Sequence, residues 1–413
     1  MFTGYRSGPG RPTSRTHGRR LAVPNVSPHV PSDTPSLPNW HPRSERASHL
    51  ADNAPEMPDP RNAKRPTIRD VARRAGVSHQ TVSRVIKGED TVMEATRDRV
   101  MAAISELDFV PSAIARSLTS DRTHTLGIVT SDIADHFFGQ AVSGAEAEAR
   151  RQGYFVIIGS VEETPGDDEQ AYLQLLLQRR VEGIILARPM LGEEGSRRLA
   201  AAASLIPLAA IGPHADIQGI DVVDIDNRQG AFDATSALVE HGHRLIATIT
   251  GPLDWASAEA RLEGYRNALQ AAGLSPSGSL EVPTAGWGLD EGREGVSRLL
   301  GAGVEFTAIF AQSDLLAIGA MTALRAHGFR VPDDVSIVGY DDIPVAAFLD
   351  PPLTTVHQPM RDVGATAVRL VLDEIAIERN GGRDGDRPPR RVSLPASLVS
   401  RASVAPPRPP IRS

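Results

Sequence analysis

Short apolar runs alternate with amphipathic helical patterns over most of the chain. The runs are LGIV at 126–129, YFVIIG at 154–159, GIILA at 183–187, LIATITG at 245–251, FTAIFA at 306–311 and VSIVGY at 335–340. Helical patterns accompany them at 142–151, 168–180, 228–241, 257–272 and 314–327. Strands that alternate with helices in this way pair in parallel, because each helix carries the chain back across the sheet. The alternation is long enough to predict an α/β body of two doubly wound parallel-sheet lobes.

Three short helical patterns precede this alternation. The first places apolar residues at i, i+3, i+4 and i+7, on one face of a helix: Ile68, Val71, Ala72 and Ala75. Gly76 then permits a left-handed turn, and Ser78 is a good N-cap for a second helix. The apolar positions of the second and third helices are Val82, Val85 and Ile86, and then Val100, Ala103, Ile104 and Leu107. Two helices joined by a tight turn and supported by a third predict an all-α helix-turn-helix head.

The charge of the chain is unevenly distributed. The whole chain has a net charge of −7, but residues 61–120 hold 11 Lys and Arg against 7 Asp and Glu. A basic segment joined to a larger acidic body indicates a module that binds a polyanion, attached to a soluble carrier. The alternative is that this modest excess of positive charge only marks a solvated surface.

Composition and motifs argue against several classes of protein. The chain contains no cysteine, which rules out disulfides and thiolate metal sites. No apolar run reaches the roughly 20 residues that span a bilayer, and no apolar core of a secretory signal follows the N-terminus. We therefore expect a cytoplasmic protein without membrane partners. No phosphate loop, nucleophile elbow or zinc-type spacing is present, so we predict no enzymatic activity, no metal and no cofactor.

The first 63 residues differ from the rest. They are rich in Pro, Ser and Arg and lack hydrophobic periodicity, which predicts a disordered N-terminal extension. Met57 lies shortly before the first helical pattern, and we hypothesise that translation starts there. The intact mass of the native protein would decide between Met57 and Met1.

The head and the body together resemble one family. IRDVARRAGVSHQTVSRVIKG and TRDRVMAAISELDFVPSAIARSL are similar to the DNA-binding head of the lactose-repressor (LacI/GalR) family of transcription regulators. VVDIDNRQGAFDATSALVEHGHRLIATITG, SDLLAIGAMTALRAHGFRVPDDVSIVGYDD and PPLTTVHQPMRDVG are similar to its body. The resemblance covers residues 66–402 in order, so it is far more specific than a single short motif. It implies that the two lobes are of periplasmic-binding-protein type.

The patterns and the resemblance together predict the domain boundaries. After the extension at 1–63 we expect a helix-turn-helix domain at 64–110 and a hinge helix or linker at 111–122. A two-lobed domain for effector binding and dimerisation follows at 123–402, and a disordered tail at 403–413.

The resemblance implies that the second helix of the head enters the major groove of double-stranded DNA. His79 and Gln80 then occupy the positions that mainly set the operator sequence, since Gln80 suits adenine N6 and N7 and His79 suits guanine N7 or O6. The alternative is that both are solvated residues at a helix start, and that Arg84 only pairs with an acid such as Asp70. The DNA-binding residues predicted in the head are Thr67, Ser78, His79, Gln80, Thr81, Ser83, Arg84 and Lys87. Among them Thr67, Ser83, Arg84 and Lys87 are candidates for phosphate contacts.

The segment ARSLTS at 115–120 resembles the hinge helix of the family. By this resemblance Leu118 wedges into the minor groove at the centre of the operator. Ala115 is small enough for the hinge helices of two subunits to approach closely. The alternative for Leu118 is that it packs within a linker helix.

The resemblance also implies an effector site between the lobes. Arg261 and Asp314 are its predicted polar contacts, because a guanidinium and a carboxylate together suit vicinal hydroxyls. Phe137, Phe138 and Trp287 are its predicted aromatic contacts. The alternatives are that Asp314 only caps a helix, that Arg261 lies on the surface and that Trp287 is ordinary core.

We therefore predict a transcriptional regulator that binds a palindromic operator as a homodimer under control of a small molecule. Within that class we predict a repressor. A carbohydrate is the expected effector. The prolines of residues 393–413 leave no room for a tetramerising heptad helix. A solute-binding protein without a regulatory role and an effector-dependent activator are the alternatives.

Overall fold

The computed structural model describes residues 66–86, 88, 91–109, 122–130, 133–161, 167–187, 201–212, 220–382 and 388–408. Outside these ranges lie the extension predicted at 1–63, including Met57, and nearly all of the hinge predicted at 111–122. Lys87, Ala115 and Leu118 also lie outside the described residues.

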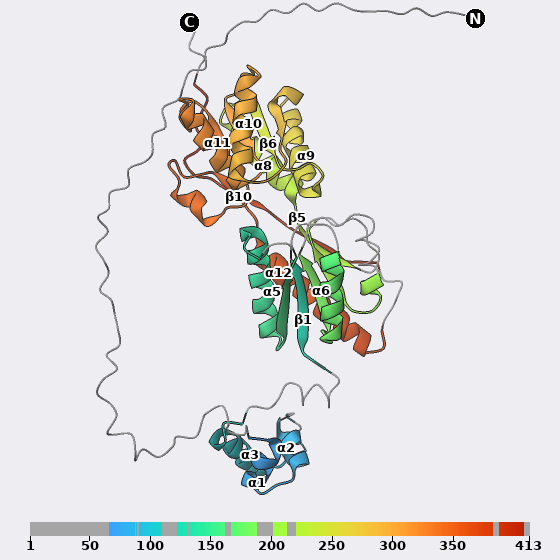
Figure 1. The fold of residues 1–413 in the computed structure, drawn as a ribbon. Helices are drawn as coiled ribbons and strands as arrows, with labels where there is room; N and C mark the ends of the chain where they lie inside the picture. The colour runs from blue at the N-terminus through green and yellow to red at the C-terminus, as the bar shows by residue number, and fades with distance from the viewer. Residues whose placement is uncertain are drawn as a thin grey trace, which may run out of the picture. The chain divides into compact units, whose positions relative to one another are not determined.

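The head consists of α1 (Ile68–Ala75), α2 (His79–Ile86) and α3 (Glu94–Glu106). Their apolar faces meet in one small core that contains Val71, Val82 and Val100, as the periodicity predicts. Gly76 has φ +67°, so the left-handed turn between α1 and α2 is confirmed. The helices therefore form the predicted helix-turn-helix (Figure 1).

The first lobe contains a six-stranded sheet in the order β11-β5-β4-β3-β1-β2, with every neighbouring pair parallel. The strands are β1 (Thr125–Thr130), β2 (Phe155–Ser160), β3 (Gly183–Ala187), β4 (Leu208–Ile211), β5 (Asp221–Ile225) and β11 (Arg391–Leu394). All residues of β3 and β4 are buried, because helices cover both faces of the sheet.

Helices α5 (His136–Arg151) and α12 (Met360–Arg379) share one face of this sheet, and α6 (Asp167–Gln178) packs on the other. Figure 1 shows α5 and α12 lying together beside β1. A Cβ atom at Gly144 would lie 1.9 Å from the carbonyl oxygen of Arg361, and one at Gly364 would lie 1.9 Å from that of Ala141. The two helices therefore touch backbone to backbone.

The second lobe contains a four-stranded parallel sheet in the order β7-β6-β8-β9. Its strands are β6 (Ile246–Thr250), β7 (Glu281–Pro283), β8 (Ala308–Ala311) and β9 (Ser336–Val338). Helices α8 (Asn227–Glu240) and α9 (Ala256–Ala271) share one core with Phe310, and α10 (Leu289–Gly301) and α11 (Asp314–Ala326) share another with Ile309. Since neighbouring residues of β8 face opposite sides, the sheet is covered on both faces. Two short 3-10 helices, η1 (Gly278–Leu280) and η2 (Pro344–Phe348), complete the lobe.

The chain passes between the lobes in three segments. The first joins β5 to α8 through Asp226, which caps α8 by accepting a hydrogen bond from the Gln229 N–H at 2.9 Å. The second joins β10 (Thr355–His357) to α12, and the third joins β11 to β12 (Ser397–Val399). Strands β10 and β12 pair antiparallel, so the second and third segments are held together.

The structure confirms the predicted fold class and the predicted strands and helices of the body. One boundary differs, because α5 begins at His136 rather than at 142: Asp135 caps it, accepting a hydrogen bond from the Phe138 N–H at 3.1 Å. The first residues of the predicted tail pack against the second lobe, where Ser403 is fully buried and its hydroxyl donates to the Ile337 carbonyl at 2.6 Å. Among the described residues, no helix is long and apolar enough to cross a membrane.

Candidate DNA interface and effector site

The N-terminus of α2 is built as the sequence predicts. The Ser78 hydroxyl oxygen accepts a hydrogen bond from the Thr81 N–H at 3.1 Å, so Ser78 is the N-cap. Val82 and Val85 are buried in the head, which turns the first residues of the helix outward. His79 and Gln80 are exposed at these first positions.

The other residues predicted to contact DNA differ in exposure. Thr67, Ser78 and Arg84 are exposed, whereas Thr81 and Ser83 are half-buried. Asp70, the alternative partner predicted for Arg84, forms an ion pair with Arg73 at 3.2 Å. The phosphate contact of Arg84 stays a prediction.

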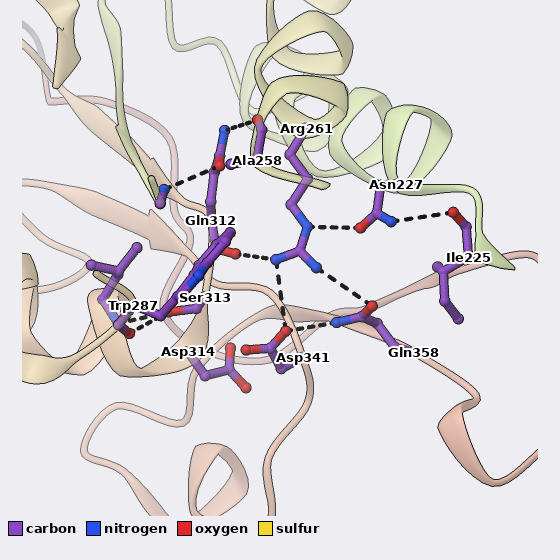
Figure 2. A network of polar contacts seen from close by, with 12 residues as sticks. Ile225, Asn227, Ala258, Arg261, Trp287, Gln312, Ser313, Asp314, Asp341 and Gln358 are labelled. Atoms are coloured by element: carbon purple, nitrogen blue, oxygen red, sulfur yellow. Dashed lines mark hydrogen bonds and ion pairs between the residues drawn. The ribbon is translucent and has the colours of Figure 1, made fainter. Parts of the chain in front are cut away.

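Arg261 of α9 is the centre of a polar network in the second lobe (Figure 2). Its side chain is buried, so the alternative reading as a surface residue is wrong. Its Nε donates to Asn227 Oδ1 at 2.8 Å, and its two terminal nitrogens donate to the Gln312 carbonyl and to Gln358 Oε1. The network therefore joins α9 to the segment between β10 and α12 through Gln358, and to the start of α8 through Asn227.

Asp341 completes this network, although the sequence did not single it out. Its Oδ1 lies 3.8 Å from Arg261 Nη1 and accepts a hydrogen bond from Gln358 Nε2 at 2.6 Å. Burial raises the pKa of the Asp341 carboxyl, and the nearby Arg261 guanidinium opposes that rise. The side chain of Asp341 keeps 22% of its surface exposed against 5% for that of Arg261, so Asp341 is the more accessible group of the pair.

The backbone at Asp341 is strained. Asp341 has φ +121° and Asp342 has φ +54°, in a region that L-residues rarely adopt. Such strain costs about 1–3 kcal/mol and gathers at functional sites. The left-handed backbone is a second reason to place Asp341 in the site.

Asp314 is fully buried and both of its carboxylate oxygens have protein partners. Oδ2 accepts a hydrogen bond from the Ile343 N–H at 2.8 Å, and Oδ1 accepts one from the Thr355 hydroxyl. Burial raises the pKa of Asp314. These contacts hold the loop after β9, and the N-cap of α11 is Ser313 rather than Asp314.

Trp287 lies beside Arg261, half-buried, with 5.3 Å between its ring centroid and the guanidinium carbon. Trp255, at the N-cap position of α9, meets it edge to face with 5.7 Å between ring centroids. The indole N–H of Trp287 is buried and has no hydrogen-bond acceptor among the described residues. The sequence predicted Trp287 and missed Trp255, whose position before α9 carries no recognisable motif.

Phe137 and Phe138 lie in the first turn of α5, in the other lobe. Their rings meet edge to face with 5.2 Å between centroids, and both pack partly against the core of the first lobe. The structure therefore brings Arg261 and Trp287 together and places the two phenylalanines on a separate element.

Comparison with known proteins agrees with this architecture. Residues 67–112 match the family of bacterial regulatory proteins of lacI type, and residues 235–404 match a periplasmic binding protein-like domain. The HTH-type transcriptional repressor PurR of Vibrio atlanticus (strain LGP32) is 36% identical over 349 residues, which cover 82% of this chain and 98% of that protein. The chain belongs to the LacI family. It carries the family's helix-turn-helix head and two-lobed domain, and its named relatives are regulators of transcription.

Solved structures of two transcription regulators are similar to most of this chain. The lac repressor dimer bound to operator and the anti-inducer ONPF is similar with a TM-score of 0.72 and 32% identity, over 83% of this chain and 100% of that one. The complex of the transcriptional regulator CelR with cellobiose is similar with a TM-score of 0.62 and 35% identity, over 82% and 100%.

Proposed function

We propose that this LacI-family protein is a cytoplasmic repressor that binds a palindromic operator as a homodimer and responds to a small-molecule effector, a carbohydrate. The observation that carries the proposal is the outward-facing start of α2, where His79 and Gln80 are exposed on a helix fixed by Ser78 and Val82. The operator-bound lac repressor, a similar protein, supports it.

In the proposed complex the side chains of the head divide into two roles. Gln80 and His79 reach base edges in the major groove and set the sequence preference. Thr67, Ser83, Arg84 and Lys87 hold phosphates and set the register of the helix, while Leu118 of the hinge kinks the minor groove.

The effector site that we propose is centred on Arg261 and Trp287, the predicted residues that the structure brings together. Asp341 and Gln358 join them, because a carboxylate, an amide and a guanidinium in one network suit the hydroxyls of a sugar. Asp314 acts behind this group as a positioning residue, and Phe137 and Phe138 face the ligand from the first lobe. CelR, which was solved with cellobiose, is a similar regulator and supports a sugar as effector.

Effector binding would act on DNA through the segments that join the lobes. Gln358 lies in one of those segments and Asn227 directly follows another, and both contact Arg261, so a ligand that displaces Arg261 or Asp341 would change the lobe connections. A rotation of one lobe relative to the other would separate the hinge helices of the two subunits and lower the affinity for the operator.

An exposed apolar surface supports the dimer. β2 is an edge strand of the first sheet, and its Phe155, Ile157 and Ile158 are exposed by 72%, 37% and 39%. Large apolar side chains on an open sheet edge are costly in water unless a second chain covers them.

Binding to DNA tests the proposal. Selection of the full chain on a random DNA library should enrich a palindrome, and retardation of that DNA should weaken steeply as salt rises. Failure to retard any enriched DNA at low salt would support the alternative, a solute-binding protein.

A further inference from the structure

The chain enters the first lobe through residues 122–124, which we call the linker root. Arg122 is the last residue of the linker predicted at 111–122, and β1 follows the root directly. The Thr123 hydroxyl donates a hydrogen bond at 2.6 Å to the carbonyl oxygen of Arg180, in the turn before β3. The linker root is therefore attached to a second strand of the sheet before β1 begins.

Glu182 is the centre of the contacts that hold the linker root. Its Oε1 accepts a hydrogen bond from the His124 N–H at 2.7 Å. Its Oε2 accepts hydrogen bonds from Arg122 Nη2 at 3.3 Å and from Arg379 Nη2 at 2.7 Å. The Tyr154 hydroxyl donates to the same oxygen at 3.2 Å and accepts from Arg122 Nη2 at 2.6 Å. Both oxygens of one carboxylate therefore bind the linker root.

The Glu182 carboxylate is charged and largely enclosed by protein. Its side chain keeps only 13% of its surface exposed. Burial acts to raise the pKa of Glu182, but the hydrogen bonds from the His124 N–H and from Arg122 outweigh it and hold the pKa below its ordinary value. Because an enclosed charge without partners is costly, Glu182 and the linker root hold each other in one arrangement.

Arg379 extends this arrangement to a long helix. It is the last residue of α12, which has 20 residues and is therefore about 30 Å long. α12 packs on the sheet of the first lobe, and its ion pair with Glu182 connects that helix to the linker root. The position of the root is thus fixed by the lobe as a whole.

The backbone on both sides of this contact is left-handed. His124 has φ +48° and Arg180 has φ +56°, in a region that L-residues rarely adopt. Such a backbone persists only where the surrounding contacts impose it, and it gathers at functional positions. A simple passage from a linker into a strand does not require it.

A fixed root matters for a dimer that binds a palindrome. One inserted base pair moves the half-sites apart by about 3.4 Å and rotates one of them by about a tenth of a turn. Binding of the second head is intramolecular, so its effective concentration depends on whether the linker spans that separation. A linker with a fixed root therefore accepts fewer separations than a linker that pivots.

We propose that Glu182 is a positioning residue, which fixes the direction in which the linker leaves the first lobe and thereby sets the spacing of the operator half-sites. The inference rests on the proposed function, since it takes the protein to bind a palindrome as a homodimer. Glu182 acts through the linker root and contacts no base or phosphate.

Binding to palindromes of different spacing tests this role. The full chain would select its palindrome from a random DNA library. Fluorescence anisotropy would then measure its affinity for that duplex, for versions with one central base pair inserted or deleted, and for a single half-site. We expect the parent protein to bind both altered spacings about tenfold more weakly than the selected one.

Glu182→Gln should reduce this preference. An amide is uncharged and has one acceptor oxygen, so it cannot hold both the His124 N–H and the two arginines. We expect Glu182→Gln to bind the three spacings within about threefold of one another, with unchanged affinity for the half-site. Arg122→Gln removes the same contact from the linker side and should behave alike.

Glu148→Gln is the matched control. Glu148 is a buried glutamate of the same lobe, and its arginine partners, Arg151 and Arg369, lie on α5 and α12. Glu148→Gln should keep the spacing preference of the parent. Thermal unfolding of every variant confirms that it is folded and shows whether the control loses comparable stability.

The outcomes separate this inference from the proposed function. An unchanged spacing preference in the folded Glu182 and Arg122 variants would overturn the inference, and so would an equal loss of preference in Glu148→Gln or a parent protein without any preference. A parent protein that binds neither the palindrome nor the half-site would contradict the proposed function itself.

Discussion

The carboxylate of Asp314 binds the backbone N–H of Ile343, with 2.8 Å between Oδ2 and the nitrogen. Asp314 opens α11, whereas Ile343 follows the strained pair Asp341 and Asp342. One buried side chain therefore anchors the loop that carries Asp341, a residue of the proposed effector site.

Replacing Asp314 by alanine should destabilise the second lobe. The Ile343 N–H and the Thr355 hydroxyl would lose their buried acceptor, at a cost of about 2–4 kcal/mol in the free energy of unfolding. Asp314→Asn should lose less, because an amide oxygen still accepts and burial already raises the pKa of the acid. Urea denaturation measures both. Unchanged stability with lost sugar binding in Asp314→Ala would instead identify a direct ligand contact.

Gln80→Ala should change which bases the head prefers. The side chain is exposed on the second residue of α2, so its removal leaves the core of Val82 and Val85 intact. The lost pairing with a base edge is worth about 1–3 kcal/mol of discrimination. Selection on randomised half-sites should give a relaxed consensus at one position; an unchanged consensus would exclude Gln80 from base recognition.

Arg84→Ala should weaken binding to all sequences by a similar factor. A phosphate contact carries no base preference, and its loss should lower the salt dependence of binding by about one ion. Fluorescence anisotropy over a salt series, with the selected operator and with a scrambled duplex, measures both effects. A loss confined to the operator would assign Arg84 to base readout.

Asp224 should make the effector domain less stable at neutral pH than at mildly acidic pH. Burial raises the pKa of Asp224 from 3.8 to about 6, so the folded protein holds this proton more tightly than the unfolded chain. Its contribution to stability therefore falls as pH rises from about 4 to 6. Asp224→Asn should be more stable than the parent at pH 7.5 by about 1–3 kcal/mol and equal to it near pH 4. The same difference at both pH values would contradict this.

Met93→Ser should stabilise the head. Met93 is the N-cap of α3, is 78% exposed and forms no side-chain cap hydrogen bond. A serine hydroxyl there would accept a hydrogen bond from an N–H of the first turn and contribute about 1 kcal/mol. Thermal unfolding of the head should shift upward for Met93→Ser and stay unchanged for Met93→Ala, the matched control for loss of the methionine side chain.

The sequence predicted those parts of the fold that have a local pattern. β3 and β6 are apolar runs bounded by polar residues, and α1 has a regular apolar face. α10 was missed because two glycines, Gly292 and Gly295, interrupt LDEGREGVSRLLG. Gly292 is nevertheless required for packing, because a Cβ atom there would lie 2.2 Å from the Leu316 carbonyl oxygen. Gly292 is required by contact with a neighbouring helix, and the local periodicity of the sequence does not show such a contact.

The candidate effector site was predicted only in part for the same reason. Arg261 and Trp287 came from resemblance, whereas Asp341 is defined by a left-handed backbone and by its distance from Arg261. Asp341 and Gln358 are 80 and 97 residues away from Arg261 along the chain, so only the folded lobe brings them together.

The close approach of Gly144 to the backbone of Arg361, and of Gly364 to that of Ala141, makes α5 and α12 one rigid unit. Helices that pack through interdigitating side chains can shift by repacking those side chains. Where two helix backbones are in direct contact, no side chains lie between them to rearrange. Met360, the first residue of α12, donates its N–H to the carbonyl of Gln358 at 2.8 Å. The packed pair of α5 and α12 is therefore linked directly to the Arg261 network. A small shift of Gln358 would therefore move α5 and α12 together, and the first lobe would rotate with them as a rigid body.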